Sequence, residues 1–360
     1  MLRLKTGLRV VACIAVSVTF CGCLVNTSPS KPPPVRIGFI AYEPGELYGP
    51  ELFIKQAAQL AVEKVNESGG LPISGQKTKV VLVTETIKSR PEAAVAAVRR
   101  LINQERVVAI VGPHVSRDAI PAGAVAEESK IPMISTGSTN PQTTAGRQFV
   151  FVVSFTDDLQ GRTMARFARG SLGLSEAAVL FDITNEYSKG LAGIFRAGFE
   201  EAGGKVTAFE AYTEDAKTDL APQFGRIRKS RAQAIYLPNY SNQDLLQQVR
   251  EARQAGIQAT FLFSEGLNAN RFPGGNFPPE LEGGYFTSSR QSASEESQKF
   301  RNLFRQRFSE DPDKDALQAY DAFGLIFQAV ESQRKADPES IQKGLHSMGS
   351  YQGISGPYDV

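Results

Sequence analysis

The sequence predicts an α/β protein with two doubly wound parallel-sheet lobes joined by crossing hinge strands. Short runs rich in β-branched residues alternate with longer segments of helical period, and this series occurs twice along the chain. A length of 360 residues is enough for two hydrophobic cores. The runs AVLF and AIYL do not alternate apolar with polar residues, which is typical of parallel strands covered on both faces.

The first series begins at residue 35. We expect strands at 35–42, 79–84, 107–111 and 131–135, and helices at 52–65, 91–104 and 117–129 between them. Gly69 and Gly70 suit the end of the first helix, and Pro91 suits the first turn of the second. The repeated strand–helix–strand order predicts a parallel sheet.

The second series follows a break. It predicts strands at 177–181, 205–209, 232–237 and 259–263, and helices at 189–202, 220–229 and 244–255. We interpret 148–155 and a segment near 284–288 as crossings between lobes, followed by helices at 295–308 and 316–333. The predicted N-terminal lobe is therefore 35–153 with 287–360, and the C-terminal lobe is 154–286.

Residues 1–23 have the pattern of a signal peptide, with basic residues before an apolar run from Val10 to Phe20. That run is too short to span a bilayer as a helix. The residues that follow it, Cys21-Gly22-Cys23, resemble a lipobox. We therefore expect lipidation of Cys23, with ordinary cleavage and secretion as the alternative. The Ser/Pro-rich segment 24–34 suits an extended tether. We therefore expect an extracytoplasmic protein with a lipid anchor.

The composition of the chain after residue 23 argues against several functions. Without the leader it has 37 basic and 38 acidic residues, a balance that gives no footprint for nucleic acid. All three cysteines lie in the leader, and neither histidine has metal-ligand spacing, so we expect no metal and no cofactor. His114, Ser116 and Asp118 alternate in one short loop, which does not suit a catalytic triad. The segment 70–75 does not suit a phosphate-binding loop, because it precedes a strand and such a loop precedes a helix; it is interpreted as a surface turn. We therefore do not expect an enzyme.

Two loops at predicted strand ends are candidates for ligand binding, because ligands of open α/β sheets bind beyond the carboxyl ends of the strands. The first runs from Gly112 to Pro121, with Ser116 near a helix start; a purely structural N-cap is the alternative interpretation. The second runs from Thr136 to Pro141 and is dense in hydroxyls; a simple turn is its alternative. Hydroxyls and helix-start N–H groups suit an anion.

Several motifs in order carry a resemblance to a known family. They are VRIGFIA, AAQLAVEKVNESGG, AVAAVRRLINQERVVAIVGPHVS, IPMISTGSTNP and, in the second half, FDITNEYSKGLAGIFRAGFEEAGGKV, AIYLPNY and LFSEGL. Together they resemble the extracytoplasmic leucine/isoleucine/valine-binding proteins of branched-chain amino-acid ABC importers. The resemblance extends from about residue 35 to residue 360 and implies the type I periplasmic-binding-protein fold.

Matched residue by residue, the resemblance implies a split site. The contacts to an α-carboxylate would be Ser116, Gly137, Ser138 and Thr139. Glu265 would take the α-ammonium, and a solvated loop acid is the alternative for this residue. Aromatic walls would come from Tyr187 and Tyr240, for which half-buried core aromatics are the alternative. Tyr48 would wall the side-chain pocket with His114 and Val115.

The implied function is a solute-binding protein of an ABC importer that closes around an amino acid or a related small amide and is recognised by a membrane permease. A sensory receptor of the same fold is the alternative, and an exported hydrolase a remote one. We expect a monomer. Departures at 188–190, at Pro238-Asn239 and at Arg117-Asp118 leave the side-chain specificity open. The resemblance also implies a last strand and a third crossing beyond Val360, so a truncated chain and a reduced variant both stay open, and a sheet edge in the second lobe is expected to be unpaired.

Overall fold

The computed structural model describes residues 32–47, 49–217, 219–288 and 293–359. The chain divides into two units, 1–32 and 33–360, and the second contains nearly all of the described residues. The signal peptide with Cys23, nearly all of the tether, and Tyr48 lie outside the described residues. In the part of the chain that the structure describes, no helix combines the length and the apolar character needed to cross a bilayer.

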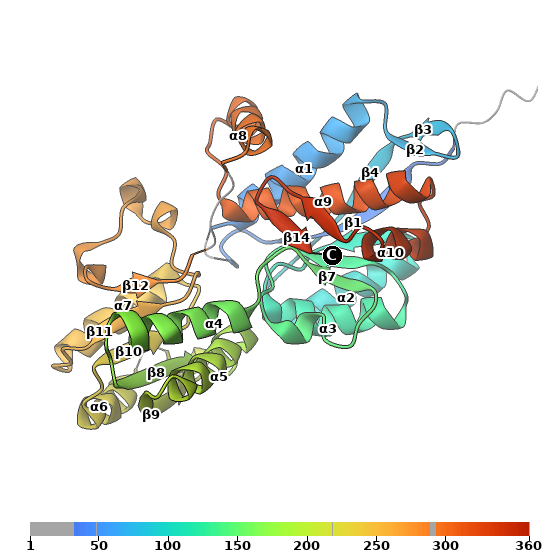
Figure 1. Ribbon diagram of the computed structural model, residues 1–360. Coiled ribbons are helices and arrows are strands. Elements are labelled where there is room, and N and C mark those ends of the chain that lie inside the picture. The colour runs from blue at the N-terminus through green and yellow to red at the C-terminus, as the bar shows by residue number, and fades with distance from the viewer. Residues whose placement is uncertain (1–31, 48, 218, 289–292, 360) are drawn as a thin grey trace, which may run out of the picture. The chain divides into compact units, whose positions relative to one another are not determined.

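The first sheet contains five parallel strands in the order β4-β1-β5-β6-β7. The strands are β1 (Val35–Tyr42), β4 (Val80–Ile87), β5 (Ala109–Val111), β6 (Met133–Ser135) and β7 (Val150–Val152). The helices packed with it include α1 (Glu51–Glu67), α2 (Pro91–Asn103), α3 (Ser116–Glu128), α9 (Lys314–Gln333) and α10 (Pro338–His346) (Figure 1). Ile37 and Phe39 of β1 are fully buried, as expected of a central parallel strand.

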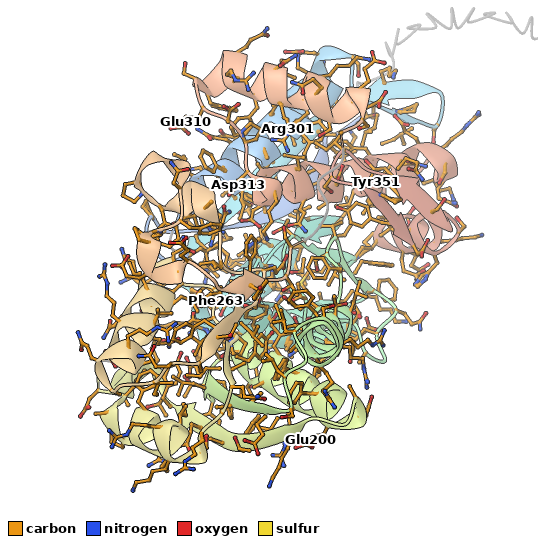
Figure 2. All side chains as sticks on the ribbon, turned by 60° about the vertical axis from the view of Figure 1, so that its left-hand side comes forward. Glu200, Phe263, Arg301, Glu310, Asp313 and Tyr351 are labelled. Atoms are coloured by element: carbon orange, nitrogen blue, oxygen red, sulfur yellow. The ribbon has the colours of Figure 1, made fainter. Side chains whose placement is uncertain are left out.

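The second sheet also contains five parallel strands, in the order β12-β11-β10-β8-β9. The strands are β8 (Glu176–Asp182), β9 (Lys205–Tyr212), β10 (Ala234–Leu237), β11 (Thr260–Phe263) and β12 (Tyr285–Phe286). Its helices are α4 (Asp157–Arg166), α5 (Glu186–Glu201), α6 (Ala221–Ser230) and α7 (Asn242–Gln254). Phe263 lies among the side chains of this sheet, whereas Glu200 of α5 lies at the surface (Figure 2).

Smaller elements complete the fold. Two antiparallel hairpins, β2 (Leu71–Ile73) with β3 (Gln76–Thr78) and β13 (Ser350–Gln352) with β14 (Pro357–Asp359), have strands of only three residues. The predicted surface turn at 70–75 is right only for Ser74 and Gly75, which form the bend of the first hairpin and have positive φ angles, whereas 71–73 belong to strand β2. Helix α8 (Glu295–Phe308) has the predicted bounds.

The predicted fold class is confirmed: the chain forms two parallel-sheet α/β lobes. The buried residues around the first sheet come from 35–153 and from 300–345, and those around the second come from 164–281. The exact lobe boundaries stay a prediction. The predicted crossing at 148–155 is a short strand, β7, that pairs with β6 before the chain enters α4. Edge strand β12 pairs with β11, and the strand expected beyond Val360 stays a prediction.

Candidate functional site

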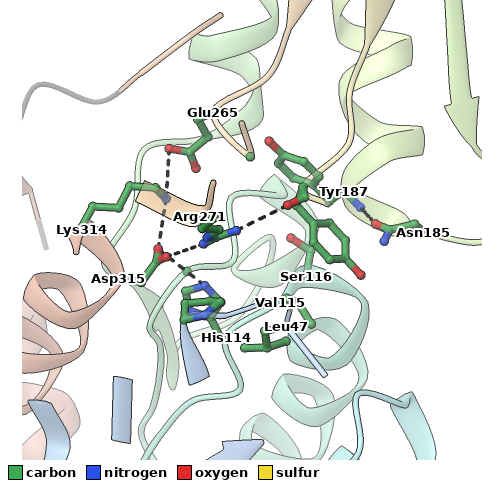
Figure 3. A pocket seen from close by; sticks show the side chains of 14 residues that line it. Leu47, His114, Val115, Ser116, Asn185, Tyr187, Glu265, Arg271, Lys314 and Asp315 are labelled. Carbon is green, nitrogen blue, oxygen red and sulfur yellow. Dashed lines mark hydrogen bonds and ion pairs between the residues drawn. The ribbon is translucent and has the colours of Figure 1, made fainter. Parts of the chain in front are cut away.

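A cavity of about 60 Å³ lies where loops of both sheets meet (Figure 3). The loops are those that follow β5, β6, β8, β10 and β11, as the strand-end rule predicts, and they are joined by the segment before α1 and the start of α9. The lining residues are Leu47, Pro50, His114, Val115, Ser116, Gly137, Asn185, Tyr187, Tyr240, Glu265, Gly266, Arg271, Lys314 and Asp315.

Ser116 lies at the first residue of α3 and contributes a hydroxyl to the cavity. The N-cap of α3 is Val115, so the alternative interpretation of Ser116 as the N-cap is wrong. The Ser116 Oγ accepts a hydrogen bond from the Ser138 Oγ at 2.9 Å and one from the Asn140 N–H at 3.4 Å. These contacts fix the hydroxyl at the N-terminus of a helix, where the dipole and the free N–H groups of the first turn favour an anion.

The loop after β6 brings Gly137 to the cavity and places Ser138 and Thr139 behind it. A Cβ on Gly137 would lie 2.1 Å from the His114 Cε1, so only glycine lets that ring pack against the loop. The Ser138 Oγ bonds the hydroxyls of Ser116 and Thr143. The Thr139 hydroxyl is buried, and its hydrogen bond to the Asp157 carboxyl opposes the rise that burial causes in the pKa of Asp157.

Glu265, two residues beyond the end of β11, lines the opposite side of the cavity (Figure 3). It is buried, with 8% of its surface exposed, so the alternative interpretation as a solvated loop acid is wrong. Its Oε2 lies 3.6 Å from the Lys314 Nζ. Burial raises the pKa of Glu265, and the nearby ammonium of Lys314 opposes that rise.

Tyr187, in the first turn of α5, and Tyr240, in the loop after β10, form an aromatic wall. Their ring centroids are 6.3 Å apart in an edge-to-face arrangement. Tyr187 follows Asn185, whose Oδ1 caps α5 by accepting hydrogen bonds from the N–H groups of Tyr187 and Ser188. Tyr187 is also part of the core below the second sheet, so the core and the cavity interpretations hold together.

A cluster of charged side chains beside Glu265 was not predicted. The fully buried carboxylate of Asp315 accepts from the Arg271 Nη2 at 2.8 Å and from the Lys314 Nζ at 3.1 Å. The His114 Nε2 lies 3.7 Å from the same carboxylate, and the His114 Nδ1 is 3.1 Å from the Thr136 Oγ1. Figure 3 shows Arg271, Lys314 and His114 converging on Asp315.

The protonation states of this cluster follow from burial and charge. Burial works against ionisation of Asp315, but the cations Lys314 and Arg271 hold the pKa of this carboxyl below its ordinary value. Burial lowers the pKa of His114 to about 4, so its imidazole is neutral near pH 7. The pKa of Lys314 is raised, because the attraction of Asp315 and Glu265 outweighs the effect of burial.

Half of the lining residues were therefore predicted from the sequence, and the other half, which includes the charged cluster, was not. Ser116, Gly137, Tyr187, Tyr240 and Glu265 reach the cavity, with His114 and Val115 as the resemblance implies. Arg271, Lys314 and Asp315 were missed. For Lys314 and Asp315 the reason is that a charged run at the start of a helix is usually solvated. One signal was available: Asp313, not its charged neighbours, is the cap of α9 and accepts from the Ala316 N–H.

The site has the composition of a binding pocket. Among the described residues, no group of three or more His, Cys, Asp or Glu side chains is placed to hold a metal ion. The cavity instead brings hydroxyls, a helix N-terminus, two aromatic rings and paired charges together between loops of two parallel sheets. These features define a binding protein for a small polar solute.

Comparison with known proteins identifies the family. A family model described as "Periplasmic binding protein" matches residues 34–360, so the chain belongs to that family. This is a family of solute-binding proteins and not of enzymes, and membership implies an extracytoplasmic location.

Individual relatives agree with the family assignment. An "Amino acid binding protein" of Pseudomonas aeruginosa is 33% identical over 213 residues, which are 59% of this chain and 55% of that protein; the match thus spans about half the length of that relative. The crystal structure of a leucine binding protein, LivK, from Thermotoga maritima has a TM-score of 0.80 and 27% identity. LivJ of Streptococcus pneumoniae, a branched-chain amino acid transporter substrate binding protein in complex with isoleucine, has a TM-score of 0.78 and 26% identity. Each structural match covers 91% of both chains.

Proposed function

We propose that this protein is the extracytoplasmic solute-binding component of an ABC importer and binds an amino acid or a related small amide in its cavity. The lobes 35–153 with 287–360 and 154–286 close around the solute by a hinge motion, and the closed form is recognised by a membrane permease. Lipidation of Cys23 anchors the protein to the membrane. Membership of the periplasmic binding protein family supports this proposal, as do relatives whose names refer to amino acids.

One observation carries the proposal: Ser116 and Glu265, from loops of different sheets, face the same cavity. A zwitterion removed from water needs both of its charges met, because a buried unpaired charge costs several kcal/mol. Hydroxyls and N–H groups at the start of α3 suit the carboxylate, and the Glu265 carboxylate suits the ammonium. Because the two halves of the site come from different lobes, binding of the solute favours the closed form.

The remaining residues have supporting roles in this proposal. The backbone at Gly137 and Ser138 and the hydroxyl of Thr139 take part in holding the carboxylate. Tyr187 and Tyr240 pack against the solute, and Tyr48 belongs to the wall of its side-chain pocket.

A thermal-shift screen over amino acids, amides, urea and small carboxylates tests the binding step. A solute that binds only the folded form raises the melting temperature with its concentration. We expect at least one amino acid or amide to do so in the wild type and to have a much smaller effect in Ser116→Ala and Glu265→Gln. A screen without any shift, followed by calorimetry without heat of binding, would contradict the proposal.

Uptake of the radiolabelled solute by cells with and without the protein tests its part in transport. We expect uptake to depend on the protein and to fall in the Glu265→Gln variant. If the purified protein binds the solute but cells take up that solute equally fast without the protein, a role in transport is contradicted and a sensory role is favoured.

A further inference from the structure

One side of the cavity is charged, where a pocket for a branched aliphatic side chain would be apolar. Glu265, Lys314 and Asp315 lie on this side in Figure 3, and Ser116 and Tyr187 lie on the other. Of the apolar lining residues, Leu47, Pro50 and Val115 come from the first lobe.

The two cations on this side are withdrawn from water. The side chain of Arg271 is 12% exposed and that of Lys314 is 20% exposed, while Asp315 is fully buried. The Nε of Arg271 is buried without a hydrogen-bond partner among the described residues. Because a buried cation or an unmade hydrogen bond is costly, this arrangement is suited to an additional acceptor.

The charges of these side chains cancel only while Glu265 is paired with Lys314. Asp315 is shared by Arg271 and Lys314, and Glu265 is the second anion near the Lys314 ammonium. This step rests on the proposed function: once Glu265 meets the ammonium of the solute, Arg271 and Lys314 face one carboxylate, and one positive charge is left over.

The neighbouring titratable groups do not provide the missing anion from the cavity wall. His114 is neutral near pH 7, because burial lowers its pKa to about 4. Asp157 and Asp313 are buried and do not line the cavity. Burial raises the pKa of both carboxyls to about 7, and Asp313 is occupied in capping α9.

We propose that the solute is an acidic amino acid, whose side-chain carboxylate lies against Arg271 and Lys314. Each of the three charges of such a solute meets a partner: the α-carboxylate meets the start of α3, the ammonium meets Glu265, and the side chain meets the surplus cation. A guanidinium suits this role because it binds carboxylates through two parallel hydrogen bonds. The cavity of about 60 Å³ has room for roughly four to six waters, which is the space of one small amino acid.

Calorimetric titration of the wild-type protein with acidic amino acids and their amides tests this proposal. L-glutamate is compared with L-glutamine, and L-aspartate with L-asparagine, because each pair has nearly the same shape and differs in charge. L-leucine is the apolar comparison. We expect at least one acid to bind ten-fold or more tightly than its amide and than leucine.

Substitutions of the two cations test whether they cause the preference for the acid over its amide. Arg271→Gln and Lys314→Gln are expected to reduce the affinity for the acid at least ten-fold and to change that for the amide by less than about three-fold. Arg250→Gln and Lys299→Gln are matched controls, because these residues form exposed ion pairs with Glu280 and Glu295. We expect both controls to keep the wild-type ratio.

The outcomes are distinct. An amide or leucine that binds as tightly as the acids overturns the inference and leaves the proposed function in place. The absence of binding of every amino acid and amide overturns the proposed function itself. If Arg271→Gln or Lys314→Gln does not fold, the ratio between acid and amide in the wild type still decides.

Discussion

The Arg271 Nη2 donates to the Asp315 Oδ2 at 2.8 Å, which joins the segment after β11 to the first turn of α9 across 44 residues of sequence. Asp315 is fully buried, and it also accepts from Lys314. The start of α9 and the loops of the second sheet are therefore connected by a buried ionic network beside the cavity.

Replacing Asp315 by Asn leaves two buried cations with one fewer anion. Removing one partner of a buried ion pair typically costs about 3–5 kcal/mol, so we expect a free energy of unfolding lower by about that amount in a urea titration. Asp311→Asn is the control, because Asp311 pairs with Arg305 at an exposed position and such pairs contribute about 0–1 kcal/mol. Equal stability of the two variants would show that the network is not a stabilising element.

Glu265→Gln keeps the size of the side chain and removes its charge. We expect the affinity for a zwitterionic solute to fall by about 3–5 kcal/mol, since the ammonium then has no anionic partner. Isothermal titration calorimetry measures this loss, and circular dichroism checks the fold. Glu280→Gln, at the exposed partner of Arg250, is expected to bind as the wild type does. Wild-type affinity in Glu265→Gln would remove Glu265 from the site.

Gly137→Ala tests the packing of His114 against the loop after β6. The new Cβ would lie 2.1 Å from the His114 Cε1, so the ring must move. We expect a loss of about 1–3 kcal/mol in stability, as is usual for overpacking, and a weaker affinity for the solute. The control is Gly193→Ala on α5, where nothing lies within 4 Å of the added Cβ. A Gly137→Ala variant as stable as Gly193→Ala would contradict the close contact between the His114 ring and this loop.

The stability of the protein should depend on His114 in acid. Burial lowers its pKa to about 4 from an ordinary 6.5, so between these values the unfolded chain binds a proton that the folded protein does not. The stabilisation is present above pH 6.5 and is lost as the pH falls toward 4, by an amount on the order of 3 kcal/mol. Urea titrations of the wild type and His114→Asn at pH 7 and pH 4.5 should show a smaller decrease in the variant.

Two buried carboxyls act in the opposite direction over part of this range. Burial raises the pKa of Asp157 and Asp313 to about 7, so their contribution to stability grows as the pH falls below 7. The comparison with His114→Asn removes their effect, because both proteins contain them. His346→Asn, at the exposed second histidine, controls for the loss of an imidazole. A decrease of the same size in wild type and His114→Asn would contradict the prediction.

Much of the fold could be predicted because parallel strands are short, apolar and separated by helices. β1, β8 and α8 have bounds at or within one residue of those predicted. The hairpins at 71–78 and 350–359 were missed, because strands of only three residues are too short to show a periodic pattern. Helix α4 was missed because it starts directly beyond the predicted crossing at 148–155.

The candidate site was predicted where it depends on local order and was missed where it depends on tertiary contacts. Ser116 and Glu265 lie in loops that follow predicted strands, and strand ends meet at one edge of a sheet. Arg271, Lys314 and Asp315 gain their role only by meeting each other, which no local pattern indicates. Ser116 suits an N-cap by residue type, but in the structure it is the first helical residue, and its hydroxyl accepts from the Ser138 hydroxyl and the Asn140 N–H.

A crystal structure of the protein with its bound amino acid shows where the two charges of the solute are held. We expect the α-carboxylate of the solute against the Ser116 hydroxyl and the backbone at Gly137 and Ser138, and the ammonium against Glu265. A solute bound outside this cavity, or in the cavity with its ammonium directed toward the start of α3, would contradict this prediction.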